Sequence, residues 1–216
     1  MKDIVSAVMD SIHMAGLVEI EVSAKHVHLT QSDCEVLFGK GATLTPKRDL
    51  SQPFQFLSDQ RVTLIGPKGS MSHVAVLGPV RNATQVELSK SDCVALGVNA
   101  PLRESGDVDG SGAITIQGPA GSLEIKQGVI IAHNHIHVTE KDSKLLNLKD
   151  KDRVAVEVLS DRPVIFEDVI IRVSQNFSCK MHIDFDEANA AFVHGFTMGR
   201  IIRKIDRKGI GRSENW

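Results

Sequence analysis

The chain has 216 residues and a formal net charge of −2, with 42% hydrophobic and 24% charged residues. This balance is typical of a folded globular protein, and it lacks the basic excess of a general nucleic-acid-binding protein. Eight Phe, one Trp and no Tyr leave few rings for stacking on bases. No apolar run approaches the about 20 residues that span a bilayer. We therefore expect neither nucleic-acid binding nor membrane insertion.

The first sixteen residues predict a short amphipathic helix that Gly16 can end. Its apolar positions fall on one face, at Ile4, Val5, Val8, Met9 and Ile12. Such a helix either packs on its own domain or docks in a groove of a partner. The acidic N-terminal residues and the lack of a continuous apolar segment do not fit a signal peptide, so we expect a cytoplasmic protein.

Three cysteines, Cys34, Cys93 and Cys179, are widely spaced along the chain. Their odd number and the absence of a CxxC pair exclude a complete disulfide framework and a cysteine-rich zinc site. We expect each to be a small buried hydrophobic residue.

From Leu17 onward, short β-rich runs alternate with turns that contain glycine and proline. The segments 66–69 and 118–121 predict hairpin loops. Many short strands at regular spacing favour a barrel or a sandwich, and neither a Rossmann glycine fingerprint nor a Walker A loop is present. The clearest strand runs are 62–65, 74–77, 113–116, 129–131, 154–158 and 169–173.

An internal repeat relates residues 22–37 to residues 131–146. Each copy contains His-x-His, then Thr-x-x-Asp, then a short segment with helical character. The Thr-x-x-Asp element predicts the start of a helix, because the threonine can cap it. The aligned pairs are His26 with His135, His28 with His137, Thr30 with Thr139, Asp33 with Asp142 and Leu37 with Leu146. Two copies indicate two related domains, each with one His-x-His at the end of a strand.

The two His-x-His pairs predict metal binding. Side chains alternate along a strand, so both imidazoles of a pair point to the same face and can reach one ion. Glu87 and His182 are the candidates for further ligands. A histidine pair with Glu87 and a pair with His182 would each leave an open position, as catalytic zinc sites do. Composition alone does not say which pair takes which ligand.

Four motifs resemble the PduL-type phosphate propanoyltransferases, a phosphotransacylase family of bacterial microcompartments. They are Lys25–Thr30, Gly78–Ser89, His135–His137 and His182–Asn189, and the resemblance runs from about Leu17 to about Ala191. It implies a mainly β fold with two β-barrels capped by short helices. The implied barrels are a discontinuous first barrel (17–24 plus 133–202) and a second barrel (25–132), and the residues themselves predict an N-terminal amphipathic helix (1–16) and a basic C-terminal tail (203–216).

The resemblance also implies two zinc ions between the barrels. The implied ligands are His26, His28 and Glu87 for one ion and His135, His137 and His182 for the other. Arg81 corresponds to the phosphate-binding arginine of the family. The implied reaction interconverts acyl-CoA (propanoyl-CoA or a similar short chain) and phosphate with acyl phosphate and CoA, by direct transfer. Alternatives are a dinuclear metallohydrolase and a non-catalytic metal-binding component of a larger assembly.

The remaining features bear on partners. The N-terminal helix resembles the encapsulation helices of the family, which implies contacts with microcompartment shell or cargo proteins and a place in the lumen. Homo-oligomerisation is left open. The basic stretch from Arg200 to Lys208 predicts a solvated tail or interface segment, with a CoA contact as the alternative.

Four histidines lie outside the implied ligand set. The family usually has an arginine where this chain has Asn134, and His133 precedes it. We expect His133 on the same strand face as His135 and His137, as a hydrogen-bond donor or a surface residue rather than a ligand. The other three match no motif and are expected to be structural or exposed: His13, His73 and His194.

Overall fold

The computed structural model describes residues 2–202, which form two compact units. The first unit takes in the described residues up to Val22, Asn134–Ile183 and the described residues from Glu187 onward. The second unit takes in Ser23–His133 and Asp184–Asp186. The domain boundaries expected from the sequence stay a prediction, and the tail at 203–216 lies outside the described residues, as does most of the basic stretch.

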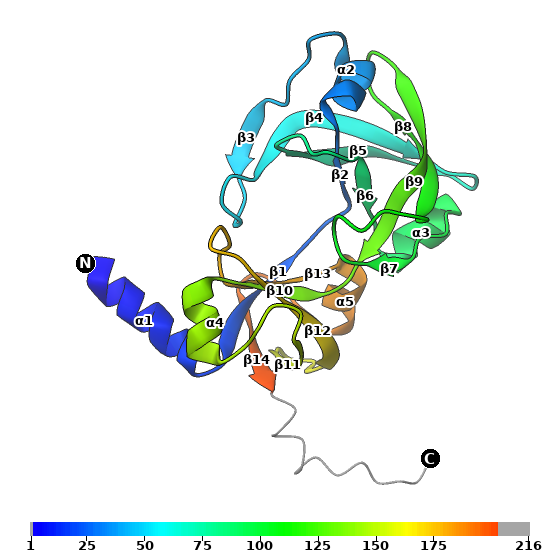
Figure 1. The fold of residues 1–216 in the computed structure, drawn as a ribbon. Helices are drawn as coiled ribbons and strands as arrows, with labels where there is room; N and C mark the ends of the chain where they lie inside the picture. Colours follow the sequence, from blue (N-terminus) through cyan, green and yellow to red (C-terminus); the bar gives the residue numbers. More distant parts are fainter. Residues whose placement is uncertain (1, 203–216) are drawn as a thin grey trace, which may run out of the picture. The chain divides into compact units, whose positions relative to one another are not determined.

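The first unit is a closed barrel with strand order β1-β13-β10-β12-β11-β14. Its strands are β1 (Leu17–Val22), β10 (His135–Val138), β11 (Arg153–Leu159), β12 (Ile165–Val173), β13 (Lys180–Ile183) and β14 (Thr197–Ile202). Three helices adjoin these strands in the sequence: α1 (Lys2–Met14) precedes β1, α4 (Glu140–Leu146) follows β10, and α5 (Phe185–Ala190) follows β13 (Figure 1). Alternate strand residues such as Val18, Ile136 and Val156 are fully buried and fill the barrel.

The second unit closes in the same way. The ring β4-β5-β2-β6-β9 is completed by β8, which pairs with both β4 and β9, while β3 and β7 extend it at β4 and β9. The strands are β2 (His26–His28), β3 (Pro46–Asp49), β4 (Phe56–Ile65), β5 (Ser70–Gly78), β6 (Gln85–Glu87), β7 (Leu102–Arg103), β8 (Gly112–Gln117) and β9 (Ser122–Ala132). Two helices belong to this unit, α2 (Gln31–Phe38) and α3 (Lys90–Leu96). The predicted mainly β fold with two barrels and short helices is confirmed.

Both predicted hairpin loops are present, and each meets the end of a helix. The loop 66–69 joins β4 to β5, and the backbone N–H of Lys68 donates to the carbonyl of Leu96 at the end of α3. The loop 118–121 joins β8 to β9, and Ala120 donates in the same way to Leu37 in α2. Gly118 is required there because a Cβ at this position would collide with the carbonyl oxygen of Leu37. The loops thus satisfy carbonyl groups that helix ends leave unpaired.

The repeated Thr-x-x-Asp elements begin helices, as predicted. The Thr30 side chain accepts a hydrogen bond of 3.1 Å from the backbone N–H of Asp33 at the start of α2. Thr139 does the same for Asp142 at the start of α4, at 3.0 Å. These caps turn the chain sharply after each His-x-His strand.

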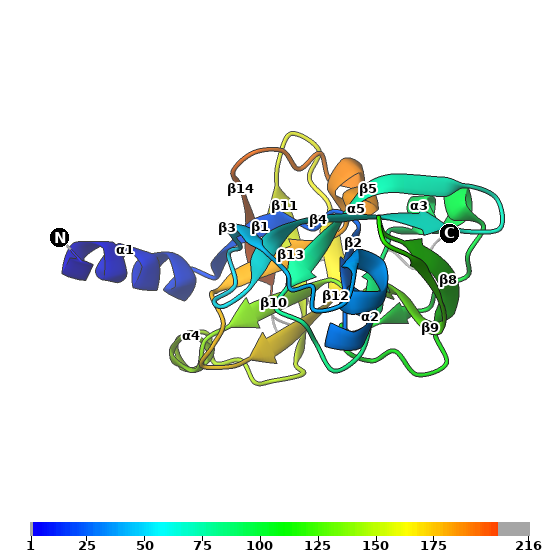
Figure 2. The same ribbon diagram turned by 90° about the horizontal axis from the view of Figure 1, so that it is seen from above.

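The predicted N-terminal helix is present as α1, and its apolar face is largely exposed. Ile4, Val5 and Val8 are 69%, 61% and 53% exposed, whereas His13 in the last turn is buried. Figure 2 shows the helix extending from its barrel, and Figure 1 shows its C-terminal end beside α4. The helix is therefore attached near its C-terminal end, and the apolar side chains of its earlier turns have little cover.

Two expectations need correction. His133 lies in the connection between β9 and β10 rather than on a strand face with His135 and His137. The strand is interrupted because the His133 N–H donates to the Arg103 carbonyl, whereas the Asn134 carbonyl accepts from Ile170. Cys34 and Cys93 are buried as expected, but Cys179 is only partly buried.

Within residues 2–202, no helix has the length and apolar character needed to cross a membrane.

Candidate metal centres and anion site

The first candidate centre consists of His26, His28 and Glu87 in the second unit. Strand β2 pairs with β6 in antiparallel register, which places Glu87 opposite His26 and Gln85 opposite His28. His26 Nε2 lies 3.5 Å from Glu87 Oε2, and His28 Nε2 lies 3.9 Å from Glu87 Oε1. Ligands at zinc bond lengths in a tetrahedron are about 3.3 Å apart. Small side-chain movements would therefore close this trio around an ion.

The donor set and its supports fit a zinc-class ion. Imidazole nitrogen and carboxylate oxygen are common zinc ligands. His26 Nδ1 lies 2.8 Å from the Ala24 carbonyl, which suits an N–H at Nδ1 and a lone pair at Nε2. Both histidines are buried, His28 almost completely. These residues would hold a divalent ion with room for a further ligand.

Electrostatic coupling within the trio is strong. Burial disfavours the charged form of His26, but the nearby charge of Glu87 and a hydrogen bond to it outweigh burial and raise the His26 pKa. Burial also opposes ionisation of Glu87, yet the neighbouring histidines hold its pKa well below the usual range. Burial, with the charges of His26 and Arg81, lowers the pKa of His28. The carboxylate is thus ionised and His28 is neutral, which are the states that bind metal, whereas the raised pKa of His26 means that this imidazole would release a proton when it binds an ion.

The second candidate centre consists of His135, His137 and His182 in the first unit. Strand β10 pairs with β13 in antiparallel register, with His135 opposite His182. The ring centroids are 4.6 Å apart for His135 and His137, 4.9 Å for His137 and His182, and 5.3 Å for His135 and His182. Glu21 lies in the neighbouring strand β1, with Oε2 3.7 Å from His182 Nδ1. Three imidazoles are also a zinc donor set.

The two centres have the same strand topology. Strand β2 pairs with β5 in parallel and with β6 in antiparallel orientation. Strand β10 pairs in the same way with β12 in parallel and with β13 in antiparallel orientation. The third side chain comes from the antiparallel neighbour in both cases. The ambiguity left by the sequence is therefore resolved in space: Glu87 lies with His26 and His28, and His182 lies with His135 and His137.

Arg81 is linked to the first centre by Ser105, which forms hydrogen bonds with both Arg81 and Glu87. Arg81 Nη1 donates to Ser105 Oγ at 3.2 Å, and Ser105 Oγ donates to Glu87 Oε1 at 2.8 Å. Gln85 Nε2 donates to Glu87 Oε1 at 2.6 Å, while the Gly106 N–H donates to Gln85 Oε1 at 2.7 Å. The network orients the carboxylate and places a guanidinium near it. A guanidinium can hold a phosphate through two parallel hydrogen bonds.

Comparison with known proteins places the chain in a family. The family model described as phosphate propanoyltransferase matches residues 19–194. The chain belongs to this family. A phosphate propanoyltransferase of Clostridioides difficile is 46% identical over 204 residues, covering 94% of this chain and 98% of the relative. Proteins of the same name from Leptotrichia buccalis and Thermotoga maritima are each 51% identical, covering 83% and 81% of this chain and 84% of each relative. This phosphate propanoyltransferase family member is an acyltransferase.

Three polar residues near the centres of this phosphate propanoyltransferase family member were not predicted. Ser105 follows β7 and carries no motif, so only the fold reveals that it joins Arg81 to Glu87. Gln85 precedes Glu87 by two residues, and strand alternation would have placed both side chains on one face. Glu21 reaches His182 through the register between β1 and β13, in which the two residues are paired. His73 and His194 are exposed, which agrees with expectation.

Proposed function

We propose that the chain interconverts acyl-CoA and phosphate with acyl phosphate and CoA. The observation that carries this proposal is the link from Arg81 through Ser105 to Glu87, which places an anion-binding side chain beside a candidate metal centre. Arg81 would bind inorganic phosphate and orient one oxygen for attack. Family membership and the names of the relatives support the same reaction.

The proposal includes two zinc ions, one in each barrel. The proposed ligands are His26, His28 and Glu87 for one ion and His135, His137 and His182 for the other. A bound zinc ion would polarise a carbonyl or phosphate oxygen and favour a thiolate ligand such as the CoA sulfur. The donor sets and the compact spacing of the first trio support this part of the proposal.

We propose direct transfer without an acyl-enzyme. A phosphate oxygen attacks the thioester carbonyl carbon, the C–O bond forms, the C–S bond breaks and CoA leaves as the thiolate. Cys34 and Cys93 make poor nucleophiles because burial raises the pKa of each thiol, that of Cys93 to about 11. Covalent acyl-protein detected by mass spectrometry as a turnover intermediate would contradict this proposal.

One assay separates this function from its alternatives. Metal-loaded protein is mixed with acetyl-CoA, propanoyl-CoA or butanoyl-CoA, with and without phosphate, and both free thiol and acyl phosphate are measured. We expect thiol release that requires phosphate and equals acyl phosphate formation. Thiol release without phosphate would instead indicate a hydrolase, and no turnover with any substrate would indicate a non-catalytic protein. The acyl series also gives the chain-length preference.

The exposed apolar face of α1 supports a second, separate proposal: residues 1–16 target the protein to the lumen of a microcompartment. The exposed residues Ile4, Val5 and Val8 would bind shell or cargo proteins. In cells that form microcompartment shells, a reporter fused to residues 1–16 should concentrate in the microcompartments. A fusion that carries Ile4→Ser and Val8→Ser should stay diffuse. A wild-type fusion that stays diffuse would contradict targeting.

A further inference from the structure

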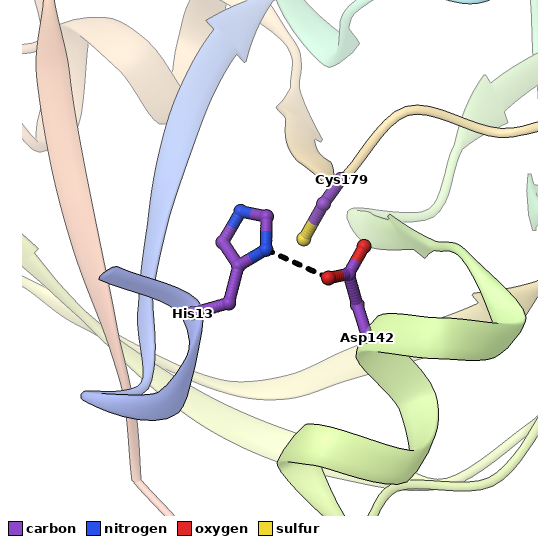
Figure 3. Close-up of side chains that lie close together, drawn as sticks. All are labelled: His13, Asp142 and Cys179. Carbon is purple, nitrogen blue, oxygen red and sulfur yellow. Dashed lines mark hydrogen bonds and ion pairs between the residues drawn. The ribbon is translucent and has the colours of Figure 1, made fainter. Parts of the chain in front are cut away.

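A third group of potential ligands lies in the first unit and shares no residue with either histidine trio. His13 belongs to the last turn of α1, Asp142 to the first turn of α4, and Cys179 directly precedes β13. One ligand atom from each residue lies within 4.8 Å of the other two. Figure 3 shows the imidazole, carboxylate and thiol pointing toward one another, with the hydrogen bond between His13 and Asp142 marked.

The Asp142 carboxylate is held in position by its own helix cap. The Thr139 hydroxyl donates to Asp142 Oδ2 at 2.6 Å, and Thr139 Oγ1 accepts from the Asp142 backbone N–H. The other oxygen, Oδ1, lies 2.8 Å from His13 Nδ1. His13 and Asp142 are both buried, at 7% and 6% exposed. One carboxylate oxygen is therefore directed at the imidazole beside Cys179.

The equivalent position of the internal repeat lacks this arrangement. Asp33, which aligns with Asp142, accepts a hydrogen bond from Thr84 through Oδ2. The helix cap is common to both copies, whereas among the residues that the structure describes an imidazole and a thiol join the aspartate only at the second copy. Helix capping alone thus accounts for an aspartate at both positions but not for the His13 and Cys179 side chains around Asp142.

We propose that His13, Asp142 and Cys179 bind a zinc-class divalent ion at a site separate from both histidine trios. Nitrogen, oxygen and sulfur donors of these types are all used by zinc, and the thiolate disfavours magnesium and calcium. One thiolate and one carboxylate neutralise the charge of a divalent ion, which lowers the cost of burying it. Water would occupy a fourth position.

Binding exchanges protons for metal at the cluster. Burial, followed by the charge of Asp142, raises the pKa of Cys179 to about 12, so the metal-free thiol keeps its proton. When the ion binds, the thiol proton passes to solvent and the hydrogen bond between His13 and Asp142 gives way to bonds with the ion. The ion would then join the end of α1 to α4 and to the start of β13. The site thereby anchors the helix whose apolar face is exposed.

Cobalt(II) titration of the chelator-treated full chain tests the proposal without measuring activity. Cobalt bound to a thiolate absorbs in the near ultraviolet through charge transfer, whereas the proposed ligands of the two trios are only histidine and glutamate. We expect the charge-transfer band to grow as cobalt is added, to disappear in Cys179→Ala and to persist in Cys93→Ala, a control that removes a cysteine outside the proposed site. The band should also persist in Glu87→Gln, which separates this site from the proposed active site.

Absence of the charge-transfer band in the wild-type chain at saturating cobalt would overturn the proposal, as would its full retention in Cys179→Ala. A second measurement covers the case in which Cys179→Ala does not fold. Zinc should slow alkylation of Cys179 in the native wild-type chain by about tenfold or more, because metal coordination occupies the reactive thiolate. Equal labelling of Cys179 with and without zinc, located by peptide mass spectrometry, would contradict zinc binding there. His13→Gln should remove most of this protection.

Discussion

Glu87 faces His26 across the antiparallel pairing of β6 with β2, and Glu87 Oε2 lies 3.5 Å from His26 Nε2. Backbone register sets this relationship, since the two residues are 61 positions apart in the chain. His182 occupies the corresponding place opposite His135 in the other barrel. The repeat therefore preserves the place of the third candidate ligand even though the residue type differs, a carboxylate in one barrel and an imidazole in the other.

Glu87→Gln should remove one metal equivalent. The substitution keeps the size of the side chain but replaces the anionic oxygen that would balance the charge of a divalent ion. We expect metal affinity and acyl transfer each to fall by about tenfold or more. Metal analysis after dialysis measures the first and the thiol-release assay the second. Glu124→Gln, at an exposed position of β9, is the matched control; unchanged metal content in Glu87→Gln would remove Glu87 from the ligand set.

Single histidine substitutions should separate the two centres. His28→Ala should lose about one metal equivalent while the His135, His137 and His182 centre keeps its own ion, because each trio lies within one barrel. His137→Ala should show the converse, and the double variant should lose both. His73→Ala, at an exposed position, controls for adventitious binding to surface histidine. Loss of both ions from either single variant would show that the centres do not fill independently.

Much of the fold could be predicted because its signals are local. The β-rich runs, the two Gly-Pro loops and the Thr-x-x-Asp caps each depend on a few neighbouring residues, and all occur where expected. His-x-His alternation likewise needs only the strand period. The pairing of Glu87 with His26 instead depends on which strands become neighbours, and composition carries no record of that choice.

The missed features also depend on long-range geometry. Ser105 lies in a loop and becomes relevant only because β7 pairs with β9, which is itself next to β6. His13 was expected to be structural or exposed, and its position beside Asp142 and Cys179 requires contacts between α1, α4 and the residue before β13. The periodicity of α1 correctly predicted a helix, but periodicity does not indicate whether an apolar face is covered.

Arg81→Lys should weaken phosphate binding and leave metal content unchanged. Lysine keeps the positive charge but lacks the planar fork that reaches Ser105 and would hold two phosphate oxygens. Loss of a charge-assisted hydrogen bond costs about 1.5–3 kcal/mol, so the KM for phosphate should rise by about 10- to 100-fold. Steady-state kinetics at saturating acyl-CoA measure this effect. Arg153→Lys, in an exposed ion pair with Asp168, is the control; an unchanged KM for phosphate in Arg81→Lys would argue against the proposed role of Arg81.

Gly118→Ala should destabilise the second barrel through a contact between a hairpin and a helix. The added Cβ would collide with the carbonyl oxygen and the Cβ of Leu37, which is fully buried in α2. Relief requires the β8–β9 loop to move away, which breaks the hydrogen bond of 3.0 Å from the Ala120 N–H to that carbonyl. Overpacking of this kind costs about 1–3 kcal/mol. Chemical denaturation should show this decrease in the free energy of unfolding. The control Ala120→Ser, in the same loop, adds an exposed hydroxyl and should change the free energy of unfolding by less than about 0.5 kcal/mol. Equal stability of Gly118→Ala and the wild-type chain would mean that the loop can leave α2 without loss, and that its packing on the helix does not stabilise the barrel.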